Sequence, residues 1–171
     1  MRKPDPALVV VLAGISAALH VGKLPPAVPV LRETLHVTLV EAGFLLSAVQ
    51  VAGMLLGVAI GAAADSWGPR RTMVAGLLIL FAASLLGGFA TTPMALLAAR
   101  AAEGLGFLLA SLPGPGLIRR LVPPDRLSRV LGLWGAYMPF GTGAALLFGP
   151  AFIAWTGWPG WWWLLASRSR R

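Results

Sequence analysis

The stretch GAAADSWGPRRTM, residues 61–73, is a small island of charge in a chain that otherwise contains long uncharged runs. It holds one acid, Asp65, and two arginines, Arg70 and Arg71. The flanking runs, residues 42–64 and 72–99, contain no Asp, Glu, Lys or Arg. Each run is long enough to cross the hydrocarbon core of a bilayer, which needs about 20 mostly apolar residues. We therefore expect residues 61–73 to connect two membrane-spanning helices.

The composition of the whole chain favours a polytopic membrane protein. The 171 residues are 57% hydrophobic and 12% charged, with a mean hydropathy of +0.80, whereas a soluble domain is about 25% charged. We expect an all-α fold with about five transmembrane helices and a partial sixth. The expected spans are residues 7–31, 41–63, 72–89, 93–115 and 130–155, followed by a partial span at 161–167 and a basic tail at 168–171.

The distribution of charge predicts how the chain lies in the membrane. The net charge is +8, which in a soluble protein would suggest a nucleic-acid partner. Here one set of alternate connections carries only Lys23 and Arg32, and most basic residues gather before the first span and in the other set: Arg2, Lys3, Arg70, Arg71, Arg119, Arg120, Arg126 and Arg129. This positive-inside asymmetry predicts a cell-membrane protein with a cytoplasmic N-terminus and no nucleic-acid partner.

The N-terminal segment and the residue types that the chain lacks limit which other features are possible. The first 20 residues also fit a cleaved signal peptide, with a basic head and an apolar run. The following segments are as apolar as the first, which favours a first span of a polytopic protein. The absence of cysteine excludes disulfides and thiolate metal sites. With neither a histidine-rich metal motif nor a phosphate-binding loop in the sequence, we expect no metal and no cofactor.

Local motifs predict where several helices begin or bend. Thr38 lies three residues before Glu41, the spacing of a capping box at a helix N-terminus. Thr92 precedes Pro93, which predicts a cap followed by proline in the first helical turn. The proline-rich end of the first span, residues 24–31, predicts a kinked helix supported by neighbouring segments.

Glycine and tryptophan patterns predict two further surfaces. Gly53, Gly57 and Gly61 recur at intervals of four on one face of the second span, which lets another helix approach closely. Five tryptophans crowd nine positions near the C-terminus and are typical of an aromatic belt at the outer membrane interface: Trp155, Trp158, Trp161, Trp162 and Trp163.

The opening stretch resembles a motif of major facilitator superfamily transporters. In that family the loop between spans two and three reads Gly, three residues, Asp, two residues, Gly, then basic residues. The matching positions are Gly61, Asp65, Gly68, Arg70 and Arg71. Ser66 and Pro69 stand where the family usually has basic residues. The resemblance implies a cytoplasmic gate that holds the two halves of a transporter together, and the alternative is an ordinary basic turn.

The fourth span is similar to a second motif of that family. In RAAEGLG, Arg100, Gly104 and Gly106 match, and Glu103 replaces a more usual Gln. The resemblance implies that Arg100 helps to bind substrate or to couple protons. Because Arg100 and Glu103 lie three residues apart on one helical face, a purely structural ion pair is the alternative.

Lys23 and His20 extend this candidate site to the first span. Since the first span runs outward and the fourth inward, Lys23 and Arg100 should lie at a similar depth. Charges within the membrane usually face a cavity or a partner, and these groups with Glu103 suggest a pocket for an anion or a weak acid. Alternatively, Lys23 snorkels to the outer headgroups and His20 only packs between helices. Gln50 and Tyr137 are candidates for neutral pocket contacts or for helix packing.

The fifth span carries a weaker likeness. Gly149 and Pro150 match the centre of a family motif found chiefly in antiporters, although the flanking positions differ. The run from residue 24 to residue 71 is most similar to the bacterial branch that includes cyanate and nitroimidazole transporters. We assign Gly53, Gly57, Gly104, Gly106, Gly149 and Pro150 to helix packing.

The resemblance covers the N-terminal half of the family's fold. A family member has about twelve spans in two similar bundles, and the C-terminal bundle has no counterpart here. We expect a truncated or half-length transporter of a small solute, partnered by lipid, protons, and a C-terminal half or a second copy, and inactive in transport alone. The alternatives are a non-transporting scaffold and an inactive gene fragment. Ser16 and His20 lack the turn and acid that a hydrolase needs, so no enzyme is expected.

Overall fold

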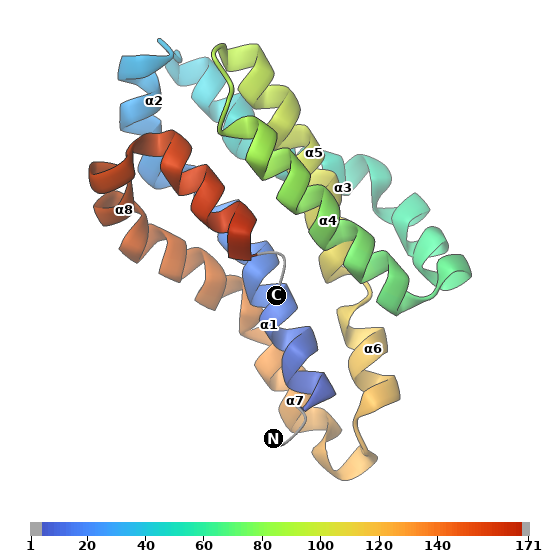
Figure 1. Cartoon of the computed structure of the whole chain (residues 1–171). Coiled ribbons are helices and arrows are strands. Elements are labelled where there is room, and N and C mark those ends of the chain that lie inside the picture. The colour runs from blue at the N-terminus through green and yellow to red at the C-terminus, as the bar shows by residue number, and fades with distance from the viewer. Residues whose placement is uncertain (1–4, 169–171) are drawn as a thin grey trace.

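The computed structural model is a bundle of helices (Figure 1), and none of the residues it describes lies in a strand. It describes the backbone of residues 5–168, and the side chains of that range except 52–54, 56–59, 62–65 and 168. The side chains of the expected basic tail, residues 168–171, therefore lie outside the described part. The elements are α1 (Pro6–Gly22), the 3-10 turn η1 (Pro25–Ala27), α2 (Val28–Thr34), α3 (Leu39–Trp67), α4 (Pro69–Gly87), α5 (Pro93–Ser111), α6 (Gly114–Leu121), α7 (Pro124–Gly135) and α8 (Tyr137–Arg168). The predicted all-α class is confirmed.

α3 and α5 begin where a side chain satisfies free backbone N–H groups. At α3, the Glu41 carboxylate accepts from the backbone N–H and the hydroxyl of Thr38, both at 2.8 Å, and the Thr38 hydroxyl accepts from the Glu41 N–H at 3.2 Å. At α5, the Thr92 hydroxyl accepts from the Ala95 N–H at 3.2 Å, and Pro93 occupies the first turn. Both predicted caps are confirmed.

Four helical segments of the described residues are long and apolar enough to cross a membrane: Pro6–Thr34, Pro69–Gly87, Pro93–Leu121 and Pro124–Ser167. α3, with 29 residues, also has the length of a span, and Leu39–Val51 is its described apolar part. Prolines bend two of these segments, at η1 in the first and at Pro113 between α5 and α6. The segment expected to start near residue 130 is instead helical from Pro124 and is divided between α7 and α8 at Ala136.

The turn between α3 and α4 is shorter than the polar loop that the sequence predicted. α3 continues to Trp67 and α4 begins at Pro69, so that Gly68 alone separates the helices. Gly68 has φ 88° and ψ 141°, a conformation that is essentially restricted to glycine. Its carbonyl accepts from the buried Thr72 hydroxyl at 3.1 Å. The glycine of the motif is therefore required by the backbone itself.

α4 and α5 cross at close range. A Cβ on Gly106 of α5 would lie 2.8 Å from the Leu80 backbone nitrogen, and one on Gly76 of α4 would lie 2.3 Å from the Ala110 nitrogen. Glycine lets two backbones approach in this way. Their contact brings the buried polar residues of α4 and α5 to the same interior.

The end of α8 folds back into the bundle. Gly157 has non-helical angles, φ 71° and ψ 172°, and divides α8 into two helical parts. The second part, from Trp158, returns between α1 and α4 (Figure 1). The sharp reversal brings the segment from Trp158 onward into the core of the bundle.

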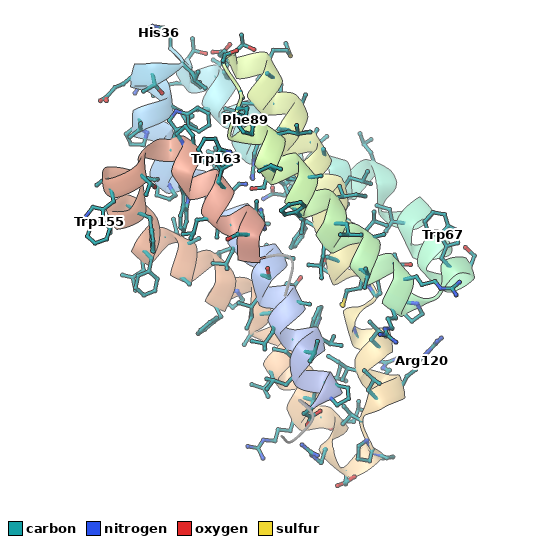
Figure 2. All side chains as sticks on the ribbon, viewed as in Figure 1. His36, Trp67, Phe89, Arg120, Trp155 and Trp163 are labelled. Atoms are coloured by element: carbon teal, nitrogen blue, oxygen red, sulfur yellow. The ribbon has the colours of Figure 1, made fainter. Side chains whose placement is uncertain are left out.

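The predicted tryptophan belt is wrong for three of its five residues. Trp158, Trp161 and Trp162 are only 6%, 3% and 0% exposed because the returning segment packs into the core. Trp155, beside the turn, is 89% exposed, and Trp163 is 40% exposed with its ring centroid 5.0 Å from that of Phe89 (Figure 2). Only these two retain the surface position that a belt requires.

Replacing Gly106 with Ala is expected to destabilise the bundle. The added methyl would meet the α4 backbone at 2.8 Å, and overpacking of this kind costs about 1–3 kcal/mol. Gly143→Ala is the matched control, because a Cβ there has no neighbour within 4 Å and alanine favours the helix. Thermal unfolding in detergent, followed by circular dichroism, measures both variants. Equal unfolding midpoints would contradict the close crossing.

Candidate functional site

Three charged side chains meet in the interior of the bundle. Lys23 follows the C-terminus of α1, and Arg100 and Glu103 lie one turn apart on α5. Lys23 Nζ lies 2.5 Å from Glu103 Oε1, and Arg100 Nη1 lies 2.5 Å from Glu103 Oε2. The three residues are 0–1% exposed. The predicted similar depth of Lys23 and Arg100 is thus observed, and Glu103 joins them; we call these residues the charge cluster.

The charge cluster contains two cations and one anion. Each oxygen of the Glu103 carboxylate accepts from a different cation, which satisfies the acid on both sides. Burying an isolated charge is far more costly than burying a paired one. The cluster as a whole carries one net positive charge, and its cations also donate hydrogen bonds to the neutral Ser84 hydroxyl and His20 carbonyl. The site is therefore suited to interact with negative charge.

His20 contributes to the same site through two contacts. Its Nδ1 lies 3.5 Å from Lys23 Nζ, and its backbone carbonyl accepts from Arg100 Nη1 at 2.7 Å. The side chain is 2% exposed. His20 thus contacts Lys23 and Arg100 directly, and its carbonyl helps to fix the position of the Arg100 guanidinium.

Sequence reasoning missed the contributions of α4 and α8. Ser84 of α4 accepts from Lys23 Nζ at 2.7 Å and donates to the Trp162 carbonyl at 2.9 Å. The Trp162 ring lies beneath Lys23 Nζ, 4.6 Å from the ring centroid, and Trp161 Nε1 donates to the Lys23 carbonyl at 3.1 Å. A single serine in an apolar helix and a tryptophan-rich end give no local signal of this role, because both depend on how distant segments pack.

Several alternatives for the candidate residues are wrong. Lys23 does not snorkel to the surface, because its side chain is fully buried. The hydroxyl of Ser16 is buried without a hydrogen-bond partner in the described part of the chain, so it does not pair with His20 as a hydrolase would require. Gln50 is exposed, and Tyr137 packs on Trp134 with ring centroids 4.5 Å apart, so neither joins the charge cluster.

The residues of the gate motif lie away from the charge cluster. Arg70 and Arg71 are exposed at the start of α4, and Gly68 forms the turn before it. A Cβ on Gly61 would have no neighbour within 4 Å. Asp65 belongs to the last turn of α3 by its backbone, but its side chain lies outside the described residues. Nothing within the described chain requires glycine at position 61.

The positions assigned to helix packing differ in their surroundings. Gly104 is buried on α5, and Gly149 lies against η1, where a Cβ would be 2.7 Å from Pro26 Cγ. Pro150 is exposed. Gly53 and Gly57 lie on α3 in the part whose side-chain surroundings are outside the described residues.

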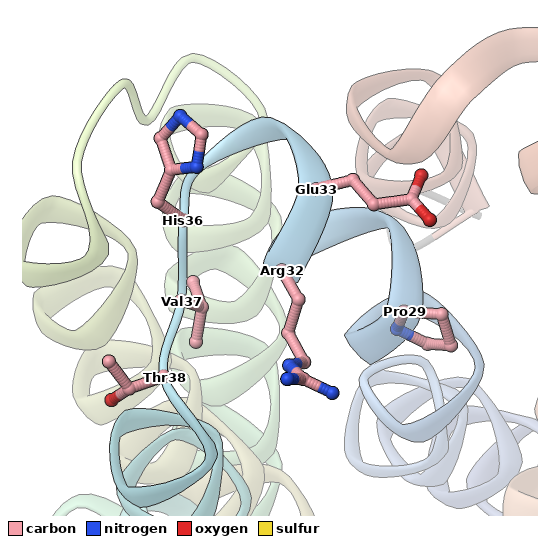
Figure 3. A pocket seen from close by; sticks show the side chains of 6 residues that line it. All are labelled: Pro29, Arg32, Glu33, His36, Val37 and Thr38. Carbon is pink, nitrogen blue, oxygen red and sulfur yellow. The ribbon is translucent and has the colours of Figure 1, made fainter.

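A separate pocket of about 510 Å³ lies where α2 leads into α3 (Figure 3). It is lined by Pro29, Arg32, Glu33, His36, Val37 and Thr38. The charged side chains Arg32 and Glu33 and the His36 ring point in different directions (Figure 3). Because its polar groups do not converge, the pocket is a weaker candidate for a binding site than the charge cluster.

Comparison with known proteins assigns the chain to a family. A family model described as Major Facilitator Superfamily matches residues 7–167. The chain belongs to this superfamily. It is accordingly a multi-pass membrane protein of a transport family and not an enzyme.

Three relatives from the superfamily illustrate the range of similarity. The tetracenomycin C resistance and export protein of Streptomyces glaucescens is 25% identical over 157 residues, 91% of this chain and 29% of that protein. The chloramphenicol resistance protein of Streptomyces lividans is 32% identical over 143 residues, 81% of this chain and 36% of that protein. The arabinose-proton symporter of Escherichia coli K12 is 26% identical over 146 residues, 82% of this chain and 30% of that protein. The chain spans about a third of the length of these relatives.

A solved structure shares the fold. In the crystal structure of a bacterial homologue of the human lysosomal transporter Spinster, inward-facing and unoccupied, 41% of that chain matches 99% of this one. The TM-score is 0.75 and the sequence identity 18%. The helices of this chain therefore share the fold of a part of that protein.

Replacing Glu103 with Gln is expected to destabilise the chain more than replacing Lys23 with Met. Glu103→Gln leaves Lys23 and Arg100 buried without a carboxylate, and breaking a buried ion pair costs about 3–5 kcal/mol. Lys23→Met leaves the Arg100–Glu103 pair balanced, so we expect a loss of about 1–3 kcal/mol. Thermal unfolding in detergent ranks the variants, with exposed Arg32→Gln as control. A larger loss for Lys23→Met would contradict the described pairing.

Gly68→Ala is expected to be destabilising, whereas Gly61→Ala is not. The Gly68 backbone is one that an alanine adopts only at a cost of about 1–3 kcal/mol. Gly61 lies within α3 with open space around it, so alanine should be neutral or stabilising there. Unfolding midpoints of the two variants measure the difference. The finding that both variants lose stability equally would show that position 61 is also constrained within this chain.

Proposed function

We propose that the chain forms the N-terminal bundle of a transporter that moves a small solute across the membrane by alternating access. The charge cluster of Lys23, Arg100 and Glu103 carries this proposal. It joins α1 to α5 deep in the bundle and holds one surplus positive charge. Buried ionisable groups are costly in a membrane protein and usually mark the path of a substrate or ion.

The surplus charge favours an anion or a weak acid as the solute. Arg100 retains an Nε donor with no hydrogen-bond partner among the described residues, although its residue is 1% exposed. A planar guanidinium binds carboxylate or phosphate groups well because it presents several donors in a fixed fork. Opening of the charge cluster would let such a group replace the internal contacts.

Proton coupling is proposed to act through Glu103. It is the one buried acid among the described side chains. Protonation of Glu103 would remove the negative charge that pairs with both cations. Lys23 and Arg100 would then become available to an anionic solute. The names of two groups of relatives, a proton symporter for arabinose and one for galactose, support coupling to protons; the exporters support a small-molecule substrate.

The gate motif is proposed to act at the junction with a second bundle. Arg70 and Arg71 are exposed at the start of α4, and Gly61 presents open space on α3. A facing helix could approach Gly61 closely and pair with the arginines. The second bundle is either a C-terminal half or a second copy of this chain. Asp65 is assigned to the same gate on its position in the motif.

The orientation follows from the basic residues. The start of α1 and the α6–α7 connection lie at one end of the bundle (Figure 1). Exposed Arg119 and Arg120 lie at the end of α6, and exposed Arg126 and Arg129 lie on α7. By the positive-inside rule we place this end in the cytoplasm and the chain in the cell membrane. The finer assignment to a cyanate- or nitroimidazole-type branch stays a prediction.

The test combines this chain with a second half. The chain is reconstituted in vesicles alone, and together with a separately expressed C-terminal half of the Streptomyces lividans chloramphenicol resistance protein. Uptake of labelled small anions and of chloramphenicol is measured with and without a proton gradient. We expect no uptake by the chain alone, gradient-dependent uptake by the pair, and loss of that dependence in Glu103→Gln.

Other results would favour another function or contradict the proposal. Copurification of the two halves without transport would favour a non-transporting scaffold. Uptake by the chain alone would contradict the need for a second bundle. Failure of the halves to associate, with both correctly folded, would contradict the proposed gate surface.

A further inference from the structure

Two adjacent tryptophans of α8 contact the same lysine in different ways. Trp161 donates through its ring N–H to the Lys23 carbonyl, at 3.1 Å. Trp162 presents its ring face to Lys23 Nζ, 4.6 Å from the centroid. The returning part of α8 therefore holds both the backbone and the ammonium group of Lys23.

The surroundings of Trp162 indicate that the ring face is its essential feature. Trp162 is 0% exposed, yet its Nε1 has no hydrogen-bond partner among the described residues. A buried tryptophan usually pairs this N–H, and leaving it unpaired is costly. The ring packs in the apolar core and makes a T-shaped contact with Trp158, with centroids 5.6 Å apart. Its polar interaction is that of the Lys23 cation with the ring face, which is strongest where water is excluded.

Ser84 connects the lysine to the same segment. Its hydroxyl accepts from Lys23 Nζ at 2.7 Å and donates to the Trp162 carbonyl at 2.9 Å. With Glu103 at 2.5 Å, Lys23 Nζ has an acid, a hydroxyl and an aromatic face around it. These groups come from α5, α4 and α8, and His20 of α1 lies at 3.5 Å.

We propose that Trp162 and Ser84 are positioning residues that hold Lys23 against Glu103. The bend at Gly157 lets the part of α8 that carries Trp162 return to the core. The inference rests on the proposed function only in that Lys23 belongs to the proposed transport site. Loss of the Trp162 ring or of the Ser84 hydroxyl would remove a contact of the Lys23 ammonium and make it more accessible.

The test measures the accessibility of Lys23 directly. The chain contains two lysines, Lys3 and Lys23, so reductive methylation of the full chain in detergent micelles, read by mass spectrometry of peptides, reports Lys23 against an internal reference. We expect Lys23 to be protected in the natural chain. In Trp162→Leu, which keeps an apolar side chain but removes the ring, Lys23 should be labelled about tenfold faster.

Three further variants separate positioning from simple packing. Trp162→Phe keeps a ring face and loses no hydrogen bond, so it should restore protection close to that of the natural chain. Ser84→Ala, a small change that should leave the fold intact, should increase labelling to an intermediate rate. Trp155→Leu changes the 89% exposed tryptophan beside the turn and should leave labelling unchanged.

The outcomes decide between the two roles. Equal labelling of Trp162→Phe and Trp162→Leu, or full protection of Lys23 in a folded Trp162→Leu chain, would overturn the proposal. Circular dichroism of each variant establishes whether it is folded. If Trp162→Leu does not fold, Ser84→Ala decides the test, because unchanged protection of Lys23 in that variant would overturn the proposal. Labelling of Lys23 requires no solute movement. The labelling result can therefore be interpreted even if the transport experiment fails.

Discussion

The interior of this bundle depends on a single carboxylate that serves two buried cations. Glu103 pairs with Lys23 from α1 and with Arg100 from its own helix, all three nearly without exposure. In a low-dielectric interior neither cation is tolerable without a partner. The Lys23–Glu103 ion pair and the hydrogen bond from Arg100 to the His20 carbonyl therefore both join the α1 segment to α5, and a movement that separates them must break or replace these contacts.

Two different features of the backbone bring α4 and α8 next to the charge cluster. α4 comes close because Gly76 and Gly106 allow the α4 and α5 backbones to touch, and this contact brings Ser84 to the interior. α8 arrives from the end of the described chain because Gly157 permits a sharp reversal. Small residues thus decide which polar and aromatic groups surround the lysine, although they make no polar contact themselves.

The superfamily motif divides into a part explained within this chain and a part directed outward. Gly68 is required by its own backbone angles, and the Thr72 hydroxyl supports that turn. Gly61 has open space around it, and Arg70 and Arg71 are exposed. This division fits a surface that meets a second bundle, since the outward residues are exposed or open to approach.

The sequence by itself determined the membrane class, the helical fold and the caps at Thr38 and Thr92. It also indicated that His20, Lys23, Arg100 and Glu103 lie close together. These follow from composition, from local spacing, and from the rarity of charge in apolar helices, all of which act over short distances along the chain. It misjudged the tryptophan-rich end, and gave no sign of Ser84 or of the Gly76–Gly106 crossing. Only the tertiary structure decided that Trp162 lies under Lys23, because the reversal at Gly157 and the close helix contact bring together residues that no local pattern connects.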